Sequence, residues 1–253
     1  MKIGSVIFLS AILVIVFSLS LIIDSSKNEE IKSIELKGDY HLSQNDYLIF
    51  AKIENPDNYS PLTPRIVKDR LEKHPYIVKA DVVLNENRLS IEIEEKKFES
   101  LIMFEGNEYL VSESSVIIPK LPNSEKIDYP IISNPSASNK IREFEKATQN
   151  EDVKIGLKII STLKIINPNL YKSLSEINLR NGKDILLQFS KFNSPVILGR
   201  NNEIEKIMYL EKLVQKFDQE HINNVLNYID LRYSKYIYLG KSKSNDSMQG
   251  SNT

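Results

Sequence analysis

The chain has 253 residues, with 33 Lys and Arg residues against 34 Asp and Glu residues, and it contains neither Cys nor Trp. The absence of Cys excludes a disulfide framework, a zinc or iron–sulfur site held by thiolates, and a thiol nucleophile. A formal net charge of −1 gives no overall attraction to nucleic acid or anionic lipid. Hydrophobic residues make up 41% and charged residues 26%, a balance typical of a folded protein, and the length predicts one or two domains.

Residues 3–23 form an almost unbroken apolar run without a charged residue. As a helix, such a run extends over roughly 30 Å, the hydrocarbon thickness of a bilayer. We therefore predict a transmembrane helix over residues 3–23, after a cytoplasmic stub of residues 1–2. The alternative is a cleaved signal peptide, because Ser18-Leu19-Ser20 resembles a cleavage site, but the apolar run continues to Ile23. The side chains predicted to span the membrane are Val6, Phe8, Leu9, Ile12, Leu13, Ile15, Val16, Phe17, Leu19, Leu21 and Ile22.

Few charges flank this apolar run. Lys2 and the amino terminus precede it, whereas Asp24, Lys27 and Glu29 follow it. The positive-inside rule therefore places the amino terminus in the cytoplasm and the body of the chain outside. The lack of Cys is compatible with an oxidising, extracytoplasmic space.

A polar spacer, residues 24–30, leads to a strand and two helices. The apolar pattern predicts the strand over residues 31–36. Ser43 is the expected N-cap of the first helix. Thr63 is the expected cap of the second helix, and Pro64 suits its first turn.

Two strands are expected after the second helix, which Pro75 ends. They cover residues 76–84 and 89–95, and the second alternates apolar and polar residues in the manner of a half-exposed antiparallel strand. The element order predicts a compact module over residues 31–97, with two helices on one face of a three-stranded sheet.

Residues 98–240 are predicted to form a β-rich domain with flanking helices. Apolar stretches favour helices over residues 153–166, ended by Asn167-Pro168, and over residues 204–217. The polar residues 241–253 are predicted to be a disordered tail. The expected strands cover residues 101–104, 109–111, 116–119, 130–132, 175–179, 184–189, 196–199, 225–231 and 235–239.

The first module resembles a POTRA domain. Residues 71–82, LEKHPYIVKADV, follow the pattern in which a helix ends at Pro and an apolar residue, Ala and a strand come next. Residues 31–38, IKSIELKG, are similar to the first strand of that domain, and Leu42-Ser43 to the start of its first helix.

The distal half resembles the bacterial cell division family FtsQ/DivIB. Val196-Ile197-Leu198-Gly199, an apolar helix and Ile229-Asp230-Leu231-Arg232, followed by an aromatic residue and an apolar strand, occur in the order found in that family. The chain departs from the family at residues 95–100, EKKFES, where Glu-Arg-x-Pro-x-Ala is common, and at residues 112–115, SESS, where Asp-x-x-Gly is common. The resemblance implies an α+β fold: a single transmembrane helix, a POTRA-like module and a β-rich domain.

The sequence nominates no catalytic chemistry. His41, His74 and His221 lie far apart and lack metal-ligand spacing, so we expect them to be solvated or to cap helices. Hydrolase and phosphate-loop motifs are absent. A cell-wall hydrolase would need two carboxylates about 5–10 Å apart in a cleft, and no pair stands out. We therefore expect no enzymatic activity, catalytic residue, cofactor, metal, nucleic acid or small-molecule substrate.

The last predicted strand is the best candidate for a binding site. An edge strand presents free backbone N–H and C=O groups to a partner strand, and aromatic side chains serve as anchors. Packing of the tyrosines on their own domain is the alternative, and the edge at residues 77–84 is a second, weaker candidate. The resemblance to FtsQ implies partners of the FtsB and FtsL type at this strand. The candidate residues are Tyr233, Ser234, Lys235, Tyr236, Ile237, Tyr238 and Leu239.

Together with these features, the resemblance to the FtsQ/DivIB family implies a non-enzymatic scaffold of the divisome, anchored in the inner membrane and concentrated at the division septum, that links early and late division proteins. A POTRA-containing envelope adaptor for protein assembly or secretion is the first alternative. A membrane-tethered peptidoglycan hydrolase is the second.

Overall fold

The computed structural model describes residues 12, 31–55, 62–137, 141–217, 222, 226–233 and 236–241. Within these residues no helix is long and apolar enough to cross a membrane. The longest of them, α4 (Glu151–Ile166), has 16 residues and carries Glu, Asp and Lys side chains. The predicted fold class therefore needs correction: the described chain is mixed α and β, but its transmembrane helix is not supported. Of the predicted span only Ile12 is described, and the other residues of 3–23 lie outside the described residues.

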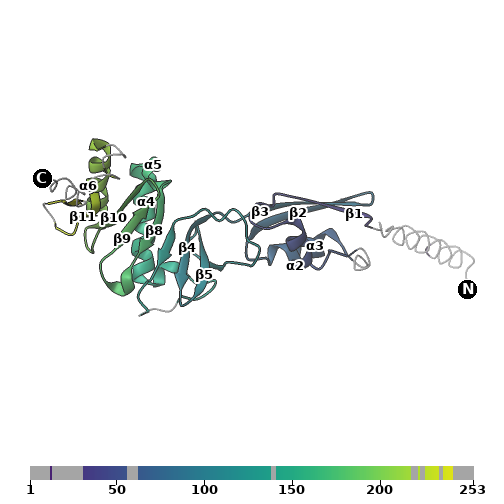
Figure 1. Ribbon diagram of the computed structural model, residues 1–253. Helices are drawn as coiled ribbons and strands as arrows, with labels where there is room; N and C mark the ends of the chain where they lie inside the picture. Colours follow the sequence, from purple (N-terminus) through teal and green to yellow (C-terminus); the bar gives the residue numbers. More distant parts are fainter. Residues whose placement is uncertain are drawn as a thin grey trace, which may run out of the picture.

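The molecule is elongated, with a small sheet at one end and a large sheet towards the other (Figure 1). The small sheet has three strands in the order β1-β3-β2, in which β1 is parallel to β3 and β2 is antiparallel to it. We call this sheet and its two helices the small unit. Its elements are β1 (Ser33–Lys37), α2 (Gln44–Phe50), α3 (Pro64–Glu72), β2 (Ile77–Asn85) and β3 (Arg88–Glu95).

Local signals set the helix starts of the small unit as expected from the sequence. The Ser43 side chain accepts from the Asp46 N–H, and the Asp46 side chain accepts from the Ser43 N–H, which completes a capping box. Thr63 caps α3, and Pro64 occupies its first turn. Both helices then bury their apolar faces against the sheet.

The large sheet has nine strands in the order β12-β11-β10-β9-β8-β7-β4-β5-β6. Three pairs are parallel (β4 with β7, β7 with β8, and β10 with β11), and the others are antiparallel. The strands are β4 (Phe98–Phe104), β5 (Asn107–Ser112), β6 (Ile117–Pro119), β7 (Ile131–Ser133), β8 (Leu174–Asn178), β9 (Leu186–Phe189), β10 (Phe192–Ile197), β11 (Leu226–Asp230) and β12 (Tyr238–Lys241).

One row of apolar side chains crosses most of the large sheet in register and shares a core with α4 and α6 (Glu203–Lys216). Close packing of α4 on the sheet explains why residue 156 is a glycine, because a Cβ there would lie 2.9 Å from Ile132 Cδ1. The shorter helical turns are α5 (Pro168–Tyr171), η2 (Ala147–Gln149) and η3 (Arg180–Gly182). The row of apolar side chains that crosses the large sheet consists of Ile102, Ile132, Ile177, Leu187, Val196, Ile229 and Leu239.

The chain passes between the two sheets through Lys96-Lys97, the short connection from β3 to β4. Phe98 and Leu101 of the large sheet belong to the same buried cluster as Tyr76 and Leu71 of the small unit. Apolar contact therefore continues across the junction.

The histidines differ from the expectation that they would be solvated or would cap helices. His41 and His74 are both buried, with 4% and 2% of their surface exposed. The His74 ring lies between Tyr47 and Tyr76 of the small unit, and the His41 ring contacts Tyr76 as well as Phe98 of the large sheet. The turns that carry them are folded inward by tertiary contacts that the local pattern does not encode. His221 lies outside the described residues.

Candidate partner-binding edge

β12 lies at one edge of the nine-stranded sheet, as expected, and among the described residues it pairs with β11. The strand itself needs correction, because it covers Tyr238–Lys241 and not residues 235–239. The Tyr236 N–H bonds to the Tyr233 carbonyl at 3.3 Å, so the chain turns before the strand begins. Of the predicted site, Tyr238 and Leu239 lie in β12 and Tyr236 and Ile237 precede it, whereas residues 234–235 lie outside the described residues.

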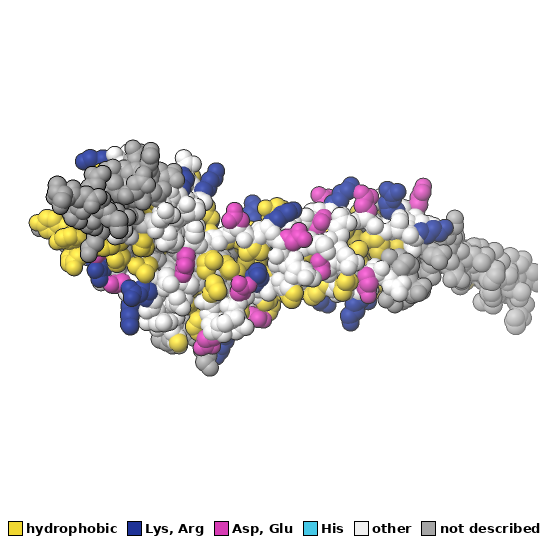
Figure 2. Space-filling view, viewed as in Figure 1, with side chains coloured by type: hydrophobic (Ala, Val, Ile, Leu, Met, Phe, Trp, Pro, Cys, Tyr) yellow, Lys and Arg dark blue, Asp and Glu magenta, His cyan; other side chains and the backbone are white. Residues whose placement is uncertain are grey.

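Three tyrosines gather at this edge, and we call Tyr233, Tyr236 and Tyr238 the tyrosine cluster. Their exposed fractions are 53%, 68% and 51%. The rings of Tyr233 and Tyr238 meet edge to face at 4.9 Å between centroids, and Tyr236 lies 6.5 Å from Tyr238. Hydrophobic side chains gather at the end of the molecule that carries β11 (Figure 2). Rigid aromatic side chains that stay exposed are typical anchors of protein interfaces.

Tyr228 and Gly240 explain how β12 is held against β11. They face each other in the register of the two strands. A Cβ at Gly240 would lie 2.2 Å from Cε1 of the Tyr228 ring, so the ring covers the glycine backbone directly. Only Gly allows this contact, which ties the short strand to its neighbour.

Arg232 holds the turn that leads from β11 to the tyrosine cluster. Its Nη2 lies 2.7 Å from the buried Asp230 carboxylate and its Nη1 lies 3.0 Å from Asp184. Burial would raise the pKa of Asp230, but the hydrogen bonds from Arg232 lower it below its usual value, so the pair stays charged. The Arg232 guanidinium also lies 5.9 Å from the centroid of the Tyr233 ring. Thus Asp230 and Arg232 position the first tyrosine of the cluster.

The opposite edge of the large sheet, β6, is covered by a neighbouring loop. The Phe144 N–H donates to the Ile117 carbonyl at 2.7 Å, and the Ile117 N–H donates to the Glu145 carbonyl at 2.9 Å. These bonds occupy backbone groups that a partner strand would need.

The β2 edge of the small unit, the second candidate from the sequence, is also covered at its centre. The Ala80 N–H donates to Glu72 Oε1 at 3.2 Å, and Lys68 Nζ donates to the Ala80 carbonyl at 2.7 Å. Lys68 and Glu72 come from α3 and form an ion pair of 3.3 Å. The hairpin partner β3 lies on the other side of β2, so helix side chains, and not the hairpin, cover this edge.

A comparison with known protein families decides the identity of the chain. Residues 101–232 match the family model described as cell division protein FtsQ/DivIB, C-terminal, and the match spans about half of the chain. The chain belongs to the FtsQ/DivIB family. None of the curated proteins compared with the chain matches it. The FtsQ/DivIB match ends at Arg232, directly before the tyrosine cluster, and begins after the small unit.

The site contains residues that sequence reasoning did not assign to it. The sequence pattern places Tyr228 inside a predicted strand, Asp184 at the start of another and Gly240 at the end of the predicted domain, and it gives none of them a role in binding. Gly240 directly follows the predicted strand, and a glycine at a strand can mark the close approach of another group, which is the available signal for its contact with Tyr228. Within the described part of the FtsQ/DivIB chain, no group of three or more acidic or histidine side chains is arranged to hold a metal ion.

Proposed function

We propose that this FtsQ/DivIB protein is a non-enzymatic scaffold of the division machinery that links early and late division proteins at the septum. The observation that carries the proposal is the tyrosine cluster beside the edge strand β12, directly after the segment that matches the family. A cell division role follows from family membership, whereas the scaffold role and its partners are our proposal.

The proposed mode of binding is strand addition at Tyr233–Leu239. A partner strand would pair with the open side of β12, and its side chains would alternate between the tyrosine cluster and the side of Leu239, which packs against the core. Partners of the FtsB and FtsL type fit this role, because the family resemblance implies them.

Two substitutions test the site. We expect Tyr236→Lys, which places a charge among the anchors, and Ile237→Pro, which disrupts the approach to the strand, to abolish capture of FtsB- and FtsL-type partners while the fold is kept. Phe144→Lys is a matched control, because Phe144 is 61% exposed at the opposite edge of the same sheet. Normal capture by folded Tyr236→Lys and Ile237→Pro proteins would rule out the site.

The alternative functions predict different observations. A fluorescent fusion should gather at midcell in dividing cells if the protein is a divisome scaffold, and a uniform envelope signal would favour the assembly or secretion adaptor. Incubation with peptidoglycan should give no turnover. Turnover that is lost when one carboxylate is replaced would establish a hydrolase.

A further inference from the structure

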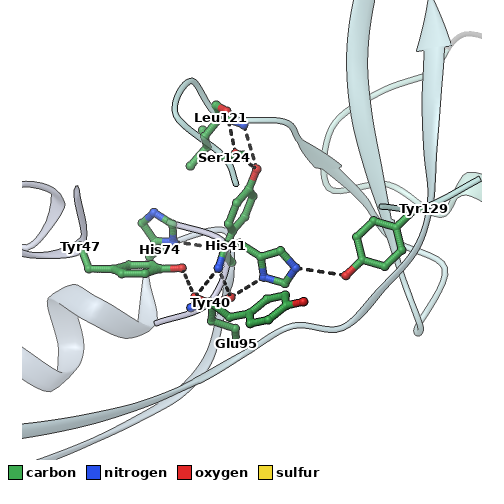
Figure 3. A network of polar contacts seen from close by, with 9 residues as sticks. Tyr40, His41, Tyr47, His74, Glu95, Leu121, Ser124 and Tyr129 are labelled. Carbon is green, nitrogen blue, oxygen red and sulfur yellow. Dashed lines mark hydrogen bonds and ion pairs between the residues drawn. The ribbon is translucent and has the colours of Figure 1, made fainter. Parts of the chain in front are cut away.

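A chain of polar side chains crosses the junction between the small unit and the large sheet, far from the tyrosine cluster along the chain (Figure 3). On the large-sheet side it involves the loop of residues 121–129, which connects β6 to β7. This loop lies against the small unit, so the two sheets touch through it as well as through the covalent connection at Lys96-Lys97.

Glu95, the last residue of β3, is the centre of the network. Its carboxylate accepts hydrogen bonds from the Tyr40 N–H at 2.8 Å, the His41 N–H at 3.1 Å, the His41 ring and the Tyr47 hydroxyl at 2.5 Å. Only 6% of the Glu95 side chain is exposed. Burial would raise the pKa of Glu95, but the hydrogen bonds from His41 and Tyr47 lower it below its usual value. The carboxylate is therefore charged at neutral pH.

His41 connects Glu95 to the large sheet. Its Nδ1 faces the Glu95 carboxylate, which can only accept, so Nδ1 carries a proton. Its Nε2 lies 3.1 Å from the hydroxyl of Tyr129, on the loop of the large sheet. Nε2 accepts from the Tyr129 hydroxyl when it carries no proton and donates to the hydroxyl oxygen when it does, so the two groups can bond in either state. Glu95 thus fixes the ring, and the ring holds Tyr129.

A second group of contacts anchors the same loop. The Tyr76 hydroxyl of the small unit accepts from the Leu121 N–H at 2.8 Å and lies 2.8 Å from Ser124 Oγ. The Glu125 N–H donates to the His41 carbonyl at 2.7 Å. The loop is therefore attached to the small unit at both of its ends.

Directional bonds of this kind specify an angle, which apolar contact alone does not. Units joined by a short connection are expected to move relative to each other unless their interface restrains them. The buried aromatic ring of Phe98 at the junction lies 5.0 Å from His41 and 6.2 Å from Tyr129, but such ring contacts tolerate several arrangements. A buried carboxylate and imidazole tolerate fewer, because each loses hydrogen bonds when it moves.

We propose that the Glu95–His41–Tyr129 chain is an orientation latch that fixes the large sheet relative to the small unit. This goes beyond the proposed function, because the latch acts on the internal geometry of the molecule whether or not a partner binds. It makes the two sheets a rigid arm between the small unit and the tyrosine cluster.

Spin labels on the full chain can measure the latch directly. The protein has no Cys, so Ser33→Cys on β1 and Ser175→Cys on β8, both exposed, take labels at those two positions only. Double electron–electron resonance should give a narrow distance distribution for this labelled parent. Tyr129→Phe, which removes one hydroxyl, should give about twice the parent's width, and Glu95→Gln should broaden it further.

Glu94→Gln is the matched control, because Glu94 is exposed on the same strand and should keep the parent's distribution. Circular dichroism and a cooperative unfolding transition establish that each variant is folded. If Glu95→Gln does not fold, Tyr129→Phe alone decides the question. A folded Tyr129→Phe protein with the parent's distribution would overturn the proposal.

Discussion

β2 and β12 are both edge strands, but the side chains that surround them differ. Side chains of α3 reach over the β2 edge and occupy the backbone groups of Ala80, whereas β12 has exposed tyrosines beside it. The edge of a sheet is a liability unless it is covered or used. The contrast fits our proposal that a partner binds at the β12 edge, because side chains of α3 already bond to the β2 edge.

Gly240→Val should break the β12 edge and give the largest effect. The new side chain would collide with the Tyr228 ring, because even its Cβ would lie 2.2 Å from Cε1. β12 should lose its pairing with β11, and the affinity for FtsB- and FtsL-type partners should fall about 100-fold, equivalent to about 2.7 kcal/mol. Surface plasmon resonance with the full chain would measure the loss.

A second substitution controls for the collision. Tyr228→Ala in the Gly240→Val background removes the ring and should restore part of the affinity. If Gly240→Val alone binds like the parent protein, β12 is not held by this contact or is not the binding edge.

Acid pH should destabilise the small unit, because this unit contains the buried His74. Burial, together with the nearby Lys96 charge, lowers the pKa of His74 from 6.5 to about 4. Between these values the unfolded chain binds a proton that the folded chain does not, so the free energy of unfolding should fall as the pH drops from about 7 to 4. We expect His74 to account for about 3 kcal/mol of that fall.

Urea unfolding across this pH range measures the effect. His74→Gln removes the titration and keeps an acceptor for the Tyr76 N–H, which now bonds to His74 Nδ1 at 3.1 Å. The variant should therefore lose less stability in acid than the parent protein. Identical pH profiles would show that His74 does not titrate differently on folding.

Glu72→Ala should uncover the β2 edge, with the smallest effect of the three. The Ala80 N–H loses its acceptor and Lys68 loses an ion-pair partner, which should cost about 1 kcal/mol. The uncovered edge should also favour self-association, which sedimentation velocity would detect.

Asp69→Ala is the control for that experiment. Asp69 forms an exposed ion pair with Lys73, and both residues lie at the end of the same helix, so the loss of this pair should cost less than about 0.5 kcal/mol. A Glu72→Ala protein as stable and as monomeric as Asp69→Ala would show that the α3 side chains do not protect β2.

Much of the secondary structure could be predicted from local residue patterns. Ser43 and Thr63 begin their helices as expected, and the hairpins at residues 86–87 and 105–106 lie where the turn residues predict them. The boundaries of β12 could not be predicted, because they depend on the turn bond between Tyr236 and Tyr233 and on the match of Gly240 to Tyr228.

The surroundings of the residues that depart from the family pattern are seen only in the tertiary structure. Phe98 stands where Pro is common, and its ring fills the junction between the sheets. Ser100 stands where Ala is common, and its hydroxyl is buried without a hydrogen-bond partner among the described residues. The sequence showed both departures but neither environment.

The sequence by itself determined the composition limits, the helix caps, the alternating strands and the motif around Ile229–Arg232, because these depend on neighbours along the chain. Tertiary structure alone decided which edges are covered, that His41 and His74 are buried, and that Glu95 reaches Tyr129 through His41. The contacts of His41 with Glu95 and Tyr129 join residues 54 and 88 positions apart, and they depend on packing that no local pattern records.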